Sequence, residues 1–244
     1  METLSDALSW LTSSANYSGE TGIVARIIGH VLISTQSVAL AAVLAVPIAF
    51  YVGHRRRYEF FAVTTGNLGR ALPSFGVLGL VFPFTFDIPG ELGYWATFFA
   101  LFLLAVPPIL ANTYVGIRGV DPDVVESARG IGYTERDVLL RLEVPLAAPL
   151  IVAGLRTALV QVVATATLGA YAGWQHGLGS FIRSGFAQGE AGRDQLLGGA
   201  ILVALLAIAT EIALGLLGRV VGPRRASRPR PRLFRSRTLR GKTA

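Results

Sequence analysis

The sequence predicts an all-α integral membrane protein that crosses the bilayer five times. Three observations support this fold class. Hydrophobic residues make up 52% of the 244 residues and charged residues only 15%, whereas soluble domains carry about 25% charged residues. The charges are separated by long apolar runs, and a helix of about 20 mostly apolar residues crosses a bilayer. Because lipid offers the backbone no hydrogen-bond partners, helices are the expected spanning elements.

Each long gap between charged residues marks one predicted span. The five spans are expected at about 29–53, 60–84, 94–117, 146–172 and 195–221. Pro73 lies inside the second span, where a proline should break or kink the helix, and Pro107 and Pro108 predict a bend in the third. Ionisable residues are costly inside a bilayer unless they pair or lie near an end of the span. Those within the predicted spans are Arg70, Arg156 and Glu211.

The distribution of positive charge predicts the orientation. The net charge is +7, but residues 223–244 contain nine Lys/Arg and no acid, which leaves 13 basic and 15 acidic residues in 1–222. The regions after the first, third and fifth spans hold 17 Lys/Arg, and the opposite side holds three. Since cytoplasmic loops are enriched in Lys/Arg, the N-terminus is expected outside and the C-terminus inside.

This topology divides the chain into three regions. Residues 1–27 are expected to be an extracytoplasmic segment, and 28–222 a transmembrane domain with a cytoplasmic loop at 118–145. Residues 223–244 are rich in Arg, Pro and Ser, a composition typical of disorder. We expect this basic tail on the cytoplasmic side, where it would be attracted to anionic lipid.

Residue content argues against several chemistries. The chain has no cysteine, and its histidines are His30, His54 and His176, which do not have the spacing of metal ligands. We therefore expect no metal site. A phosphate-binding loop needs a glycine five residues before Gly-Lys-Ser/Thr. Ser236 stands at that position before Gly241-Lys242-Thr243, so the sequence predicts no ATP site in this chain and no enzyme activity of its own.

The 118–145 loop is expected to fold into a helix–turn–helix. Asp121 is a good helix N-cap, and a short helix should run from there to Ile131. Gly132 suits the left-handed residue that follows a helix, and Thr134 can cap a second helix. Pro145 is expected to end that second helix and lead into the fourth span. Two capped helices on a loop point to a protein-docking role.

A known motif covers this loop. The residues that carry it are Glu126-Ser127-Ala128, Gly132 and Leu142-Glu143-Val144-Pro145. Three residues separate the first group from the glycine, and nine separate the glycine from the last group. The pattern resembles the EAA loop of ABC-importer permeases: E-A-A, three residues, G, nine residues, I-x-L-P. Ser127, Leu142 and Val144 depart from it by small or apolar exchanges.

Other segments narrow the resemblance to the osmoprotectant branch of these permeases. They are Leu72–Leu80, Pro108–Ile117, Ala153–Ala158 and Gly177–Ile182, in that order. The resemblance covers about residues 28–218, and His176 departs from it where the family commonly has glycine. It implies a five-span core like that of the methionine-importer permease. It also implies import of a quaternary-ammonium osmoprotectant such as glycine betaine, carnitine, choline or proline.

The resemblance further implies partners and site residues. Such permeases pair with a second permease, two cytoplasmic ATPases that bind ATP and Mg, and an external substrate-binding protein, all at the bacterial inner membrane. By residue matching, the ATPase-coupling residues would be Glu126, Ser127, Ala128, Gly132, Leu142 and Pro145. Candidate translocation-pathway residues are Pro73, Ser74, Asn112, Thr113, Tyr114, Thr165, Thr167, Gly177 and Gly179. Small residues among these serve close helix packing equally well.

Three alternatives remain open at this point. The nearest is a permease of an amino-acid importer of the methionine type. A secondary transporter would normally show an internal repeat and paired ionisable groups near mid-membrane, and five spans with peripheral charges argue against it. A membrane-embedded enzyme would need a nucleophile, a carboxylate pair or a metal-ligand cluster, none of which the sequence suggests.

Overall fold

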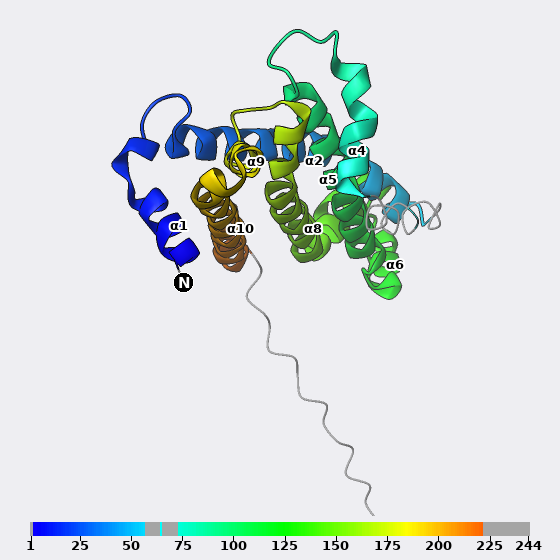
Figure 1. The fold of residues 1–244 in the computed structure, drawn as a ribbon. Helices are drawn as coiled ribbons and strands as arrows, with labels where there is room; N and C mark the ends of the chain where they lie inside the picture. Colours follow the sequence, from blue (N-terminus) through cyan, green and yellow to red (C-terminus); the bar gives the residue numbers. More distant parts are fainter. Residues whose placement is uncertain (1, 57–63, 65–72, 222–244) are drawn as a thin grey trace, which may run out of the picture.

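The computed structural model describes residues 2–56, 64 and 73–221, and every regular element within them is helical (Figure 1). The α-helices are α1 (Glu2–Thr12), α2 (Ile23–His54), α4 (Ser74–Val81), α5 (Tyr94–Arg118), α6 (Pro122–Gly130), α7 (Glu135–Asp137), α8 (Val144–Thr165), α9 (Gly179–Ala187) and α10 (Arg193–Val221). A π-helical segment (Val138–Glu143) joins α7 to α8. The 3₁₀ segments are Ser14–Asn16, Phe82–Thr85, Ala166–Ala172 and Gly189–Gly192.

Four helical stretches are long and apolar enough to cross a membrane. They are Ile23–His54, Tyr94–Arg118, Glu135–Ala172 and Gly189–Leu216, and Ser74–Thr85 is a shorter apolar helix. These agree with four of the predicted spans, while most of the second span, Arg70 and the 223–244 tail lie outside the described residues. The first spanning helix, α2, begins at Ile23 and not at about residue 29 as expected, because the charged residue Arg26 is included within it. The Arg26 side chain donates to Ser180 and lies 4.2 Å from the centre of the Phe181 ring.

The prolines differ in their effect on the helices. Pro73 has an extended backbone, with ψ of 119°, immediately before α4, which confirms the predicted break. Pro107 and Pro108 lie inside α5, which remains one helix from Tyr94 to Arg118, so the bend expected there stays a prediction.

The core is formed where α2, α5 and α8 cross. Figure 1 shows α2 running across α8 and α5, with α10 beside α8. The buried residues of this core are Ile33, Val38, Ala41, Ala45, Leu101, Ala105, Ile109, Ala158, Val162, Ala166 and Trp174. Alanine is frequent among them, and small residues at such interfaces allow helix backbones to approach closely.

The chain between Ala172 and Gly179 is irregular and is held from α2. His30 is fully buried, its Nε2 lies 2.8 Å from the Val163 carbonyl oxygen, and the Leu178 N–H donates to its Nδ1 at 3.3 Å. A Cβ on Gly29 would lie 2.2 Å from the His176 carbonyl oxygen. The irregular segment therefore fits only against a helix with glycine at this position.

The α5–α8 crossing yields a stability prediction. A Cβ on Gly154 would lie 2.8 Å from Asn112 Cβ and 3.1 Å from the Pro108 carbonyl oxygen. We expect Gly154→Ala to lower the free energy of unfolding by about 1–3 kcal/mol through overpacking, measured as a fall in Tm of the purified protein. Gly79→Ala is the control, because nothing lies within 4 Å of a Cβ there. Equal Tm values for the two variants would contradict the packing argument.

Candidate functional site

The first helix of the 118–145 loop has the predicted caps. Asp121 accepts a hydrogen bond from the Asp123 N–H at 2.9 Å, and α6 follows from Pro122 to Gly130. Gly132 has φ of +96°, the left-handed conformation expected of it. The sequence therefore determined both ends of α6, to within one residue at its C-terminus.

The second helix of the loop begins as predicted but does not end as predicted. Thr134 Oγ1 accepts from the Asp137 N–H at 3.2 Å, which confirms the cap. The expectation that Pro145 ends this helix is wrong, because the chain passes from α7 through Val138–Glu143 into α8 without a break. Proline cannot make the ordinary i→i−4 bond of an α-helix. The π-helical turns before it have a different bonding pattern and accommodate it.

The loop has a small apolar core of its own. Its members are Val120, Val125, Ala128 and Val138, with Leu142 packed against them. Ala128 and Leu142 thus face the interior of the loop, whereas Glu126, Ser127, Gly132 and Pro145 are exposed. The two apolar motif residues hold α6 in place, and the exposed ones are free to meet a partner.

Sequence reasoning missed an exposed apolar tip on the same loop. Val124 is 43% exposed, Ile131 78% and Tyr133 40%. Ile131 and Tyr133 are the chain neighbours of the exposed Gly132. No sequence signal marked these residues, because isolated apolar residues in a loop show no periodic pattern.

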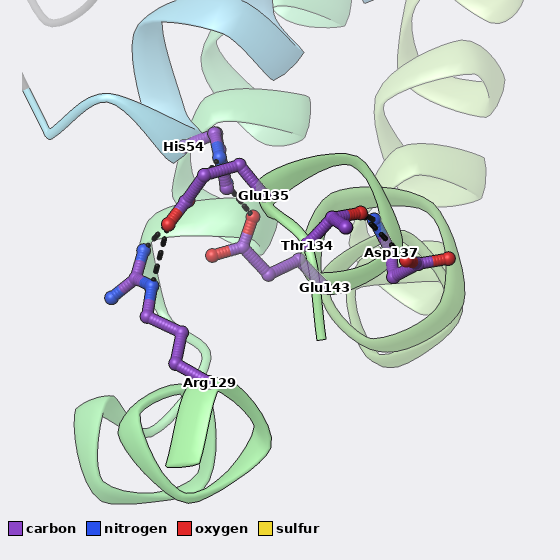
Figure 2. A network of polar contacts seen from close by, with 6 residues as sticks. All are labelled: His54, Arg129, Thr134, Glu135, Asp137 and Glu143. Atoms are coloured by element: carbon purple, nitrogen blue, oxygen red, sulfur yellow. Dashed lines mark hydrogen bonds and ion pairs between the residues drawn. The ribbon is translucent and has the colours of Figure 1, made fainter. Parts of the chain in front are cut away.

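A polar network ties the loop to the end of α2 (Figure 2). Arg129 donates to both carboxylate oxygens of Glu135 at 2.9 Å. His54, the last residue of α2, places Nε2 3.0 Å from Glu135 Oε2 and Nδ1 2.6 Å from Glu143 Oε2. The hydrogen bonds that Arg129 donates to the Glu135 carboxylate raise the pKa of the guanidinium. Sequence reasoning found no partner for His54, because its partners Glu135 and Glu143 are more than 80 residues away in the chain.

The candidate pathway residues do not form one cavity in this single chain. Ser74 and Thr165 line the same small cavity of about 10 Å³. Asn112 bonds to the carbonyl of its own helix, and Thr113 and Tyr114 are buried with no hydrogen-bond partner for their hydroxyls among the described residues. The remaining members are scattered: Pro73 is exposed, Thr167 bonds within its own segment, and Gly177 and Gly179 are buried against Trp174 and Thr167.

Of the two arrangements open to the ionisable residues inside the spans, pairing is present for Arg156 and Glu211. Arg156 on α8 donates from Nε to Glu211 Oε2 on α10 at 3.0 Å, and a second contact joins the same side chains. Such fork-like pairing is the strong form of an ion pair. It neutralises both groups where isolated charges would be costly.

The family model for the inner membrane component of binding-protein-dependent transport systems matches residues 38–227. The chain belongs to this family. As a member it is a multi-pass protein of the inner membrane, in agreement with its four apolar helices. The matched range includes the whole 118–145 loop and most of each long apolar helix.

Relatives and solved structures refine the family assignment. A carnitine transport permease protein, OpuCB of Listeria monocytogenes, is 37% identical over 77% of this chain and 83% of its own. A choline transport system permease protein, OpuBB of Bacillus subtilis, is 34% identical over 80% and 86%. The MetNI methionine ABC transporter in its inward-facing form has a TM-score of 0.69 at 20% identity, covering 88% of this chain and 98% of that chain. The fold is therefore that of an ABC-importer permease.

The Thr134 cap is open to direct measurement. Thr134→Ala removes the acceptor for the Asp137 N–H and should destabilise the start of α7 by about 0.5–2 kcal/mol. We expect faster amide hydrogen exchange in residues 135–143, read by mass spectrometry. Thr157→Ala serves as the control, because the Thr157 hydroxyl bonds only to the Ala153 carbonyl one turn earlier. Unchanged exchange in Thr134→Ala would mean that the cap does not stabilise the loop.

Proposed function

We propose that this permease translocates an osmoprotectant, either a quaternary-ammonium compound such as glycine betaine, carnitine or choline, or proline, driven by ATP hydrolysis in a separate subunit. The observation that carries the substrate class is the set of relatives at 32–37% identity, which are named for carnitine, choline and glycine betaine. The methionine transporter is similar at 20% identity, a level that supports a common fold and not a common substrate.

The 118–145 loop is proposed as the contact with the ATPase. Its exposed motif residues lie beside the apolar tip of Ile131 and Tyr133, a combination that suits a protein partner. Six of the 15 acidic residues of the chain lie in this loop. These would meet basic groups on the ATPase, which would hold the ATP and Mg.

The assembly and orientation complete the proposal. The permease would act as one of a pair, copies or sisters, with an external substrate-binding protein. The loop and the C-terminus would face the cytoplasm and the N-terminus the outside, because the loop side carries the excess of Lys/Arg. The pathway would lie between the two permeases, which fits the scattering of its candidate residues in one chain.

Uptake by cells tests the substrate class. The permease would be expressed with the ATPase and binding protein encoded beside it, in a strain that lacks osmoprotectant uptake. We expect salt-stressed cells to accumulate radiolabelled glycine betaine, carnitine or choline, because these share the quaternary ammonium group. Labelled methionine is the comparison, and accumulation of methionine alone would overturn the substrate assignment.

A second test addresses coupling through Gly132. Aspartate tolerates a left-handed backbone better than most residues, and nothing lies within 4 Å of a Cβ at Gly132. Gly132→Asp should therefore leave insertion intact while placing a charged side chain at the proposed ATPase contact. We expect transport per ATP hydrolysed to fall about tenfold, which corresponds to ~1.4 kcal/mol.

The matched control is Gly189→Asp. Gly189 also has a positive φ, +63°, and also has open space around its Cβ position, but it lies in the α9–α10 connection far along the chain from the loop. This variant should transport normally. Import at the wild-type rate by Gly132→Asp would remove the coupling assignment.

A further inference from the structure

The His54 side chain joins the end of α2 to the 118–145 loop through polar contacts. Among the described residues, it is the α2 side chain that forms polar contacts with the 118–145 loop. Through Glu135 it reaches Arg129 on α6, and through Glu143 it reaches the π-helical segment that leads into α8 (Figure 2). One imidazole ring thus connects the end of the first spanning helix with both α6 and the start of α8.

The cluster of His54, Glu135 and Glu143 has one hydrogen-bond donor too few if the imidazole is neutral and both carboxylates are ionised. A neutral imidazole has one N–H and one lone pair, and an ionised carboxylate only accepts. In His54, however, each ring nitrogen faces a carboxylate oxygen, at 2.6 Å for Glu143 and 3.0 Å for Glu135. Both contacts are favourable only if the cluster carries one more proton, either on the imidazole or on a carboxyl group.

No neighbouring positive charge among the described residues takes the place of that proton beside Glu143. The charged groups on the described elements around His54, which are the ends of α2 and α5, α6, α7 and the π-helical segment, are Arg55, Arg56, Arg118, Asp123, Glu126, Arg129, Glu135, Arg136, Asp137, Arg141 and Glu143. Arg129 is engaged by Glu135, and Arg141 lies 3.1 Å from Asp137. Within the described part of the chain, no guanidinium pairs with Glu143, whose side chain is 3% exposed. A carboxylate so buried depends on its one polar partner.

We infer that His54 is a positioning residue for coupled transport, which carries movement of α6 to α2 only while its cluster holds the extra proton. When that proton leaves as the pH rises, a lone pair faces a carboxylate and the link between α6 and α2 loosens. The inference rests on the proposed ATPase contact of the loop. It adds a residue outside the motif, on a different helix, and makes the coupling sensitive to pH on the loop side of the membrane.

The test uses the complete transporter, with ATPase and binding protein, in vesicles of fixed lipid composition. The pH on the loop side is varied between about 5 and about 8, the interval over which histidine is the side chain that ordinarily changes charge, while the other side is held constant. Glycine betaine transported per ATP hydrolysed is the readout. We expect the wild-type ratio to fall about fivefold or more across this range, as a charge-assisted hydrogen bond is lost.

Two variants distinguish the effect of the extra proton from the effect of the hydrogen bond between His54 and residue 143. His54→Gln cannot take up a proton, so its ratio should be low and independent of pH. In Glu143→Gln, the amide N–H can donate to His54 Nδ1 while Nε2–H donates to Glu135, so no extra proton is needed. Its ratio should stay high and independent of pH. If His54→Gln does not assemble, Glu143→Gln decides the question alone.

A matched control comes from the other histidine pair. His176 Nδ1 also lies 2.6 Å from a glutamate oxygen, that of Glu91, in the connections at the opposite end of the helices. His176→Gln should keep the wild-type profile. A flat wild-type profile, or a wild-type profile in either His54→Gln or Glu143→Gln, would overturn the inference. Absence of glycine betaine transport by the wild type would instead count against the proposed function.

Discussion

The constraint on which the structure depends is that backbone groups inside a bilayer must find partners within the protein. At the break between α8 and α9, the buried side chain of His30 provides hydrogen-bond partners for the backbone groups. Leu178 donates its N–H to Nδ1, so the hydrogen of this neutral ring is on Nε2 and is donated to the Val163 carbonyl. One side chain of the first spanning helix thereby satisfies backbone groups on both sides of the break.

Close backbone approach is the second consequence of this constraint. A Cβ on Gly179 would lie 2.0 Å from the Thr167 carbonyl oxygen, and one on Gly169 would lie 2.5 Å from Thr97 Oγ1. Without side chains at these points, irregular segments are buried against helices and are shielded from lipid. Gly179 was a candidate pathway residue, and in this chain its evident role is packing.

Two pairs of charged groups follow a related rule, because each joins partners on different helical segments. Arg156 is matched by Glu211 across α8 and α10, and Glu143 by His54 across the π-helical segment and α2. These pairs join segments 55 and 89 residues apart in the chain. They therefore fix helix positions as well as neutralising charge, and the second of them gives the loop its link to the membrane domain.

The sequence by itself determined the long apolar helices and the caps of the 118–145 loop. Charge-free runs located the helices, Asp121 and Gly132 marked the ends of α6, and Thr134 marked the start of α7, because these signals act within a few residues. Only the tertiary structure decided what lies between elements: the His54 cluster, the core beneath α6 and the continuous helix through Pro145. These arise from contacts between distant residues and from the sum of backbone bonds around a turn, and neither has a local pattern that a sequence can display.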